Sequence, residues 1–196
     1  MSEQPLFAFS PFTSAYMLQA FDAAGRGLRV TFANHGDRMA HAIAYVERSS
    51  NAERITELCA SLEGAANETW PPSSPLQSLS IEQRASGNVA LLVGMAGRSH
   101  WSASFATFAG STRILVEHAC RVSGEAERLG SGYRCPLDNV ILETDNGQEL
   151  FLSVGATRIR WRAKQIEIIG DANVLFPADQ PWSAKPVRWQ YELEIV

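Results

Sequence analysis

The segment 187–195 alternates strictly between apolar and polar side chains, and this alternation constrains the fold more than any other feature. Its apolar members are Val187, Trp189, Tyr191, Leu193 and Ile195, and its polar members are Arg188, Gln190, Glu192 and Glu194. Successive side chains of a β-strand point to opposite faces of the sheet, whereas a helix would scatter both sets around its axis. The segment therefore predicts a strand with one face in the core.

Alternation of the same kind recurs earlier in the chain, with turn residues between the alternating runs. The turn at 34–37 contains a glycine and two residues that form side-chain hydrogen bonds in turns, so it predicts a hairpin. Pairing across this turn places Phe32 opposite Met39 on an apolar face. A second hairpin is expected to place Trp101 opposite His118, again with one apolar face.

Further strands are expected at 76–83, 88–95 and 157–169. A third hairpin is predicted around Asn146-Gly147, because this dipeptide suits a tight type I′ turn. The alternation within 157–169 changes phase near Lys164-Gln165, which predicts a β-bulge there.

One segment, near residues 51–63, is expected to form a short helix. Its apolar residues recur at helical spacing, at positions Ile55, Leu58, Cys59 and Leu62. Residues 50–53 have the form of a capping box, and Gly64 suits the end of a helix.

The chain of 196 residues, 45% hydrophobic and 19% charged, is long enough to bury a core and has a composition unlike that of disordered proteins. About ten strands and one helix favour a mainly-β fold, an antiparallel β-sandwich or a closed barrel. We expect residues 1–196 to form a single domain.

The balance of charges, cysteines and apolar runs excludes several classes of protein. A net charge of -4 gives no reason to expect nucleic acid as a partner. The three cysteines are irregularly spaced, which favours reduced thiols in a cytoplasmic protein. No apolar stretch approaches the roughly 18 residues of a membrane span, and no cofactor motif is evident, so neither a membrane nor a cofactor is expected.

His41 and His118 each fall in the apolar row of a predicted hairpin. The first interpretation is a pair of buried histidines with hydrogen-bond partners. The alternative is that they bind a metal ion or act as a general base in a cavity.

His100 lies near a predicted strand end, on the same face as Ser102 and away from Trp101. A serine, a histidine and a carboxylate such as Glu117 are the groups that acyl transfer requires. Residues two apart on one strand are about 6–7 Å apart at Cα, which makes a direct hydrogen bond between Ser102 and His100 awkward. A ligand-binding patch that includes His100 is the favoured interpretation of this region.

Two other groups of residues are candidates for ligand binding. Trp70 and Trp182 lie in proline-rich irregular segments, where aromatic rings can stack on a sugar or a partner. Arg158, Arg160 and Arg162 form a basic stripe that could bind an anion. The alternatives are loop anchoring for the tryptophans and a solvated strand face for the arginines.

Two functional hypotheses follow from these observations. The first is a non-enzymatic binding or assembly domain that takes a small ligand, a sugar, a protein partner or a second copy of itself. The second is a cavity-bearing barrel enzyme that uses buried histidines with a metal or as a general base. The absence of a nucleophile or cofactor motif favours the first hypothesis.

Overall fold

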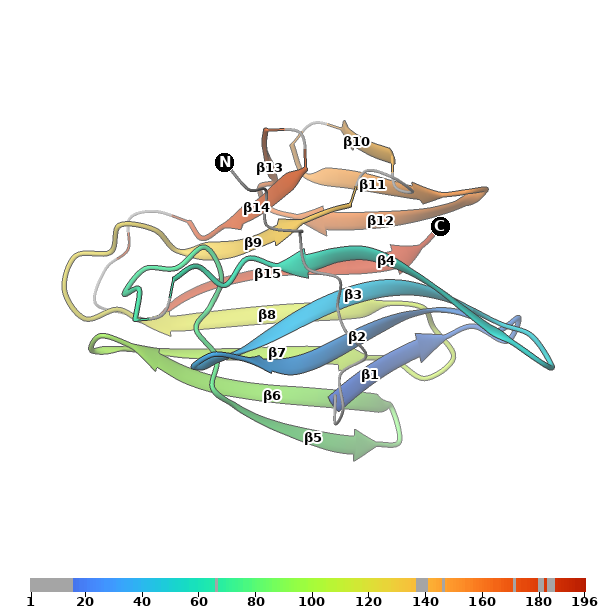
Figure 1. Ribbon diagram of the computed structural model, residues 1–196, viewed down its shortest axis with the longest axis horizontal. Helices are drawn as coiled ribbons and strands as arrows, with labels where there is room; N and C mark the ends of the chain where they lie inside the picture. Colours follow the sequence, from blue (N-terminus) through green and yellow to red (C-terminus); the bar gives the residue numbers. More distant parts are fainter. Residues whose placement is uncertain are drawn as a thin grey trace, which may run out of the picture.

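The computed structural model describes residues 16–65, 67–136, 141–145, 147–170, 172–179, 182 and 186–196. These residues form fifteen β-strands, and no helix occurs among them. The strands make two antiparallel sheets (Figure 1).

Sheet A has seven strands in the order β1-β2-β3-β4-β9-β14-β13. They are β1 (Tyr16–Phe21), β2 (Arg26–His35), β3 (Arg38–Arg48), β4 (Glu53–Ser61), β9 (Gly130–Arg134), β13 (Glu167–Ile169) and β14 (Asn173–Pro177).

Sheet B has eight strands in the order β10-β11-β12-β15-β8-β7-β6-β5. They are β5 (Ser78–Arg84), β6 (Gly87–Ala96), β7 (Ser99–Thr107), β8 (Ile114–Arg121), β10 (Ile141–Asp145), β11 (Glu149–Val154), β12 (Thr157–Ala163) and β15 (Val187–Ile195).

The core lies between the two sheets and is built from the alternating positions of their strands. In β15, Trp189, Tyr191 and Leu193 are buried, whereas Arg188 and Gln190 on the opposite face are exposed. This confirms the strand predicted from its alternation. Each sheet has an edge strand at both ends of its order within the described residues, so the predicted sandwich is observed and the closed barrel is not.

Two predicted hairpins form, each with a register shifted by two residues from our prediction. Phe32 pairs with His41 rather than Met39, because the turn between β2 and β3 is shorter than expected. Trp101 pairs with Cys120 rather than His118, because the loop between β7 and β8 is longer. A shift of two residues keeps every side chain on its predicted face, so the alternation was informative although the turns were misjudged.

The predicted helix near 51–63 is wrong, since this segment contains strand β4. The register between β3 and β4 shifts at Ile43/Ala44, where Cys59 pairs with Ile43 and Glu57 pairs with Ala44. The extra residue, Leu58, is buried together with its neighbour Cys59. A β-bulge therefore produced the adjacent apolar positions that imitate helical spacing.

The predicted bulge near Lys164-Gln165 is instead the point at which the chain leaves one sheet for the other. Strand β12 belongs to sheet B, and β13 belongs to sheet A. The pairing of β12 with β15 ends where Ala163 lies opposite Tyr191. Residues 187–190 of β15 therefore pair with no strand of the described chain on the edge that faces β12, whereas their other edge pairs with β8.

The turn predicted at Asn146-Gly147 involves Asn146, which lies outside the described residues. The two strands that flank it, β10 and β11, are paired as an antiparallel hairpin. Among the described residues there is no helix of the length and apolar character needed to cross a bilayer.

Candidate functional site

A groove runs over the outer face of sheet B and has a volume of about 1020 Å³. Strands β6, β7, β8 and β15 form its floor, and residues 162–165 and 176–179 line its side. This side lies where β12 leaves sheet B, next to the unpaired edge of β15. The groove is therefore a consequence of the crossover between the sheets.

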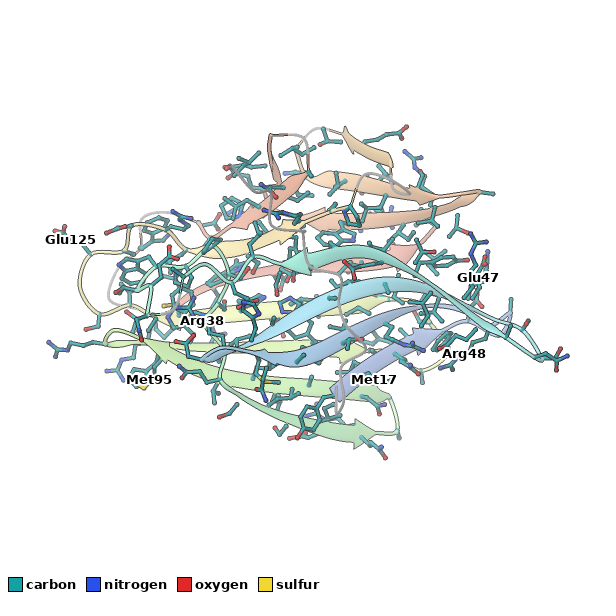
Figure 2. The ribbon with its side chains drawn as sticks, in the orientation of Figure 1. Met17, Arg38, Glu47, Arg48, Met95 and Glu125 are labelled. Carbon is teal, nitrogen blue, oxygen red and sulfur yellow. The ribbon has the colours of Figure 1, made fainter. Side chains whose placement is uncertain are left out.

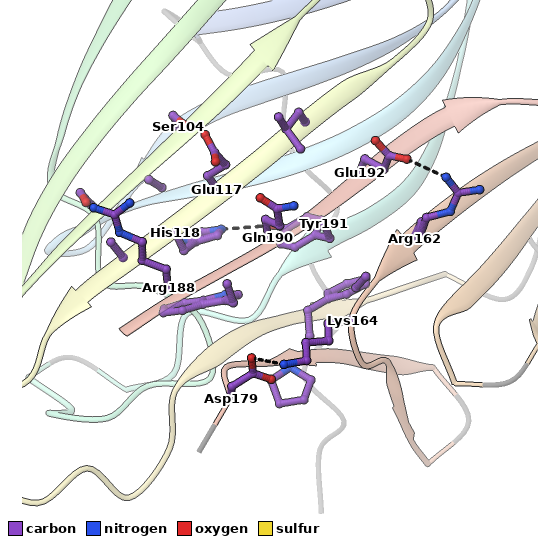
Figure 3. A pocket seen from close by; sticks show the side chains of 18 of the residues that line it. Ser104, Glu117, His118, Arg162, Lys164, Asp179, Arg188, Gln190, Tyr191 and Glu192 are labelled. Carbon is purple, nitrogen blue, oxygen red and sulfur yellow. Dashed lines mark hydrogen bonds and ion pairs between the residues drawn. The ribbon is translucent and has the colours of Figure 1, made fainter. Parts of the chain in front are cut away.

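Polar side chains lie in register across the floor of the groove. Ser104 of β7 pairs with Glu117 of β8, and Glu117 pairs with Gln190 of β15. Neighbouring strands are about 4.8 Å apart, so this row of three groups crosses three strands within one small area. Figure 3 shows Ser104, Glu117 and Gln190 along this line.

A second row lies two residues further along each strand and consists of Ser102, Ala119 and Arg188. Ser102 and Ala119 have short side chains, so they leave space above the sheet between the longer side chains of Glu117 and Arg188. A groove with a floor of small residues and a few longer polar groups leaves room for a ligand above the sheet.

The other charged side chains of the groove are neutralised by one another. Glu192 forms ion pairs with Arg113 at 2.8 Å and with Arg162 at 3.2 Å. Lys164 is 2.5 Å from Asp179, and both interactions at Arg162 and Lys164 are drawn in Figure 3. These pairs hold their members in place along the rim.

Glu117 and Arg188 differ from these groups because neither has an ion-pair or hydrogen-bond partner for its side chain within the described part of the chain. Both are exposed in the groove. Gln190, Ser102 and Ser104 likewise form no side-chain hydrogen bond to another described residue. These five residues, which we call the open polar set, are thus available to a ligand.

Of the three residues considered for acyl transfer, only Ser102 and Glu117 line the groove. His100 is exposed on the same outer face and lies opposite Arg121. No hydrogen bond joins His100, Ser102 and Glu117 among the described contacts, and Glu117 lies opposite Ser104. The structure therefore does not bring these three residues together as a catalytic triad.

The basic stripe of β12 is matched by carboxylates on the neighbouring strands. Arg158 pairs with Glu143 at 3.2 Å and also lies 3.7 Å above the ring of Phe151. The remaining ion pairs of the stripe join Arg160 to Glu149 and Glu194, and Arg162 to Glu149 and Glu192. Compensated charges of this kind fit a solvated sheet face better than an anion site.

Trp70 and Trp182 belong to the same apolar cluster, which also contains Trp101 and Trp189. Trp70 is buried and lies with its ring centroid 6.1 Å from that of Trp101. Trp182 is partly exposed and donates a hydrogen bond from Nε1 to the carbonyl oxygen of Ala178 at 3.4 Å. The two rings anchor irregular segments to the body and do not form an open aromatic platform.

His41 and His118 lie in the core, on opposite sheets, and belong to one chain of hydrogen bonds. His41 Nε2 is 2.7 Å from the hydroxyl of Tyr133, which shares a short hydrogen bond with the hydroxyl of Tyr191. His118 Nε2 is 3.3 Å from the Tyr191 hydroxyl, and its Nδ1 is 2.9 Å from Ser74 Oγ. We call these five side chains the core polar chain.

Burial keeps the core polar chain uncharged. Desolvation lowers the pKa of both His41 and His118 to about 3, and His41 further lowers the pKa of His118. Burial likewise raises the pKa of the Tyr133 and Tyr191 hydroxyls. Neutral groups donate and accept within the chain, so it ties sheet A to sheet B without a buried charge.

Glu63 extends this polar region toward the surface near Arg38, which Figure 2 labels. Its carboxyl accepts a short hydrogen bond from Ser61 Oγ, and Ser61 Oγ accepts one from the backbone N–H of His41 at 2.9 Å. Arg38 Nη1 donates to the carbonyl oxygen of Glu63 at 2.5 Å. Burial raises the pKa of Glu63 to about 7, against the opposing effects of Ser61 and Arg38.

Sequence reasoning missed Arg188, Gln190 and Ser104 as groove residues, although it placed the first two on the polar face of β15. The signal that could have found them is the combination of that polar face with the small polar face of β7. The missing information was that β8 alone separates these two strands.

No group of three or more His, Cys, Asp or Glu side chains that could hold a metal occurs within the described residues. A scan of protein-family models, a search of curated proteins and a search of solved structures each found no match to this chain.

Proposed function

We propose that this protein is a non-enzymatic binding domain that holds a short saccharide in the groove on the outer face of sheet B. The observation that carries the proposal is the open polar set, five groups without partners in a groove whose other charges are paired.

The charges of the groove favour a neutral ligand. The open polar set contains one carboxylate, Glu117, and one guanidinium, Arg188, so it carries no net charge. A phosphate or nucleic acid would meet Glu117 without a compensating excess of cations. A ligand with many hydroxyl groups can donate to the carboxylate and accept from the guanidinium at once.

The chemistry of the remaining members also fits a polyhydroxylated ligand. Gln190 can both donate and accept hydrogen bonds, as can the hydroxyls of Ser102 and Ser104. The five groups come from three adjacent strands, so a rigid sheet holds them at fixed spacing. Preorganisation of this kind lowers the entropic cost of binding.

The size of the groove supports an oligosaccharide over a single sugar. Its volume of about 1020 Å³ is at the upper end of the range of small-molecule sites. The exposed side chain of Val93 in β6 lines the same groove on the outer face of sheet B. Its apolar surface is positioned to contact the less polar face of a sugar ring.

The test is a glycan-array screen followed by calorimetric titration of the strongest ligand. The Glu117→Gln and Arg188→Gln variants are each expected to weaken binding by about 10-fold or more, since each removes a charge-assisted hydrogen bond worth about 1.5–3 kcal/mol. Both positions are exposed, so the variants are expected to keep the stability of the parent within about 0.5 kcal/mol.

Two control variants carry the same chemical changes away from the groove. Glu125→Gln alters an exposed glutamate in the β8–β9 connection, at one end of the molecule in Figure 2. Arg54→Gln alters an exposed arginine of β4 in sheet A. Equal losses of affinity in the control and groove variants, or no saccharide bound by the parent, would count against the proposal.

A further inference from the structure

A short seam joins the two parts of sheet A. Strands β3 and β4 are paired from Ala42 to Arg48, whereas β4 and β9 are paired only through Ala60↔Arg134 and Ser61↔Tyr133. One further backbone hydrogen bond, from Leu62 N to Gly132 O at 2.9 Å, extends this pairing. The β4–β9 seam is the shortest of the ladders that hold sheet A together in the described chain.

Two of the three cysteines lie at the end of this seam. Continuing the register of β4 and β9 by one residue beyond Ala60↔Arg134 places Cys59 directly opposite Cys135. Both side chains are fully buried, and the Cys135 thiol contributes to the raised pKa of the Cys59 thiol. The third cysteine, Cys120, lies in sheet B within a separate apolar cluster.

The hydrogen-bond phase of the seam suits a disulfide at this position. Hydrogen-bonded and non-hydrogen-bonded pairs alternate along an antiparallel ladder. Leu62 and Gly132 form a hydrogen-bonded pair, and Cys59 and Cys135 lie three pairs further along, so they form a non-hydrogen-bonded pair. Cα atoms of such pairs are about 4.5 Å apart, which is within the range that disulfides span.

We propose that Cys59 and Cys135 form a cross-strand disulfide that staples β4 to β9 when the protein folds in the presence of a low-molecular-weight disulfide oxidant. Burial in the folded state raises the pKa of the Cys59 thiol, so the folded protein keeps this thiol protonated and slow to react. The reaction takes place before the seam closes, while both thiols are accessible.

The chemistry balances with glutathione disulfide as the oxidant. The Cys59 thiolate attacks one sulfur of glutathione disulfide, forms a mixed disulfide and releases one glutathione thiolate. The Cys135 thiolate then attacks Sγ of Cys59 and releases the second glutathione thiolate. The two cysteines lose two electrons and two protons, and one glutathione disulfide becomes two reduced glutathiones.

The test refolds the full-length, reduced protein from denaturant in a buffer of equal reduced and oxidised glutathione. The protein is then unfolded in the presence of an alkylating reagent, so that buried free thiols are also blocked, and peptides are mapped by mass spectrometry without reduction. The expected product contains a Cys59–Cys135 peptide pair in most molecules, with Cys120 alkylated. Oxidised protein is expected to melt several degrees above the reduced form, and the difference is expected to disappear after reduction.

The Cys120→Ser variant is the matched control and is expected to oxidise to the same extent as the parent. The Cys135→Ser variant is expected to leave Cys59 alkylated or joined to glutathione. Full alkylation of all three cysteines in the refolded parent would overturn the proposal. So would disulfides shared equally between Cys120 and the other two, or an oxidised form that melts no higher than the reduced one.

Discussion

The hydroxyl of Tyr133 lies at the centre of the core polar chain, where it touches one side chain from each sheet. It is 2.7 Å from His41 Nε2 in sheet A and forms a short hydrogen bond with Tyr191 in sheet B. Tyr133 is fully buried, so a group that loses this partner cannot turn to water instead. The hydroxyl therefore contributes to both the stability and the alignment of the sandwich.

Replacing Tyr133 with phenylalanine is expected to lower the free energy of unfolding by about 1–3 kcal/mol, because the change leaves a buried ring nitrogen of His41 without a partner. Urea denaturation followed by tryptophan fluorescence measures this loss. Tyr45→Phe is the control, since the Tyr45 hydroxyl bonds Glu47 at a part-buried site. A smaller loss for Tyr133→Phe than for Tyr45→Phe would contradict the role given to the core polar chain.

The buried histidines make stability depend on pH. Their pKa is about 3 in the folded protein and has an ordinary value of 6.5, so the unfolded chain binds their protons first as the pH falls. Each is expected to reduce the free energy of unfolding by up to ~1.4 kcal/mol per pH unit between about pH 6.5 and 3.

Glu63 has the opposite effect, because its pKa of about 7 lies above its ordinary value of 4.5. The folded state binds this proton first and gains stability as the pH falls from about 7 to 4.5. Between pH 6 and 5 the parent is therefore expected to lose on the order of 1 kcal/mol, Glu63→Gln about twice as much and His118→Gln almost nothing. Urea titrations at these two pH values measure the losses, and three equal slopes would refute the assignment.

At the scale of the elements, the strands were easier to predict than the contacts between them. Alternation identified β15 and both arms of the first two hairpins. Buried and more exposed positions alternate along β7, β8 and β15, whereas both faces of β2 and β3 are largely buried. It failed at β4, where the bulge at Leu58 and Cys59 interrupts the period of two. Turn length set the register, and residues 34–37 fit more than one turn.

The irregular residues 62–65 and 67–77 connect sheet A to sheet B and contact strands of both sheets. The backbone N–H of Met39 in β3 donates to Leu76 O at 2.7 Å, and that of Gln77 donates to Val93 O in β6 at 2.8 Å. Gly94 of β6 faces this segment so closely that an added Cβ would overlap the carbonyl oxygen of Pro75. The glycine is therefore required for the close approach of the two backbones.

The Gly94→Ala variant is expected to lower the free energy of unfolding by about 1–3 kcal/mol, since the segment must move away from β6. Chemical denaturation measures the change. Gly110→Ala is a comparison of different origin: an added Cβ there has nothing within 4 Å, and its cost comes only from the φ of 70°. A loss for Gly94→Ala below about 0.5 kcal/mol would show that the close approach contributes nothing.

At the scale of the molecule, the candidate site arises from how the chain passes between its sheets. The departure of β12 at Lys164 shortens its pairing with β15 and leaves the side of the groove beside Gln190. Sequence placed the phase change correctly but could not distinguish a bulge from a change of sheet. It also could not place β8 between β7 and β15, which is the arrangement that assembles the open polar set.

The most direct measurement is a two-dimensional NMR titration of isotope-labelled protein with the saccharide selected from the array. Shifts are expected to be concentrated in β7, β8 and the first half of β15, around Ser104, Glu117 and Gln190, and to be lost in Glu117→Gln at the same ligand concentration. Shifts concentrated instead at the tryptophan cluster around Trp70, or on sheet A, would contradict the proposed saccharide site.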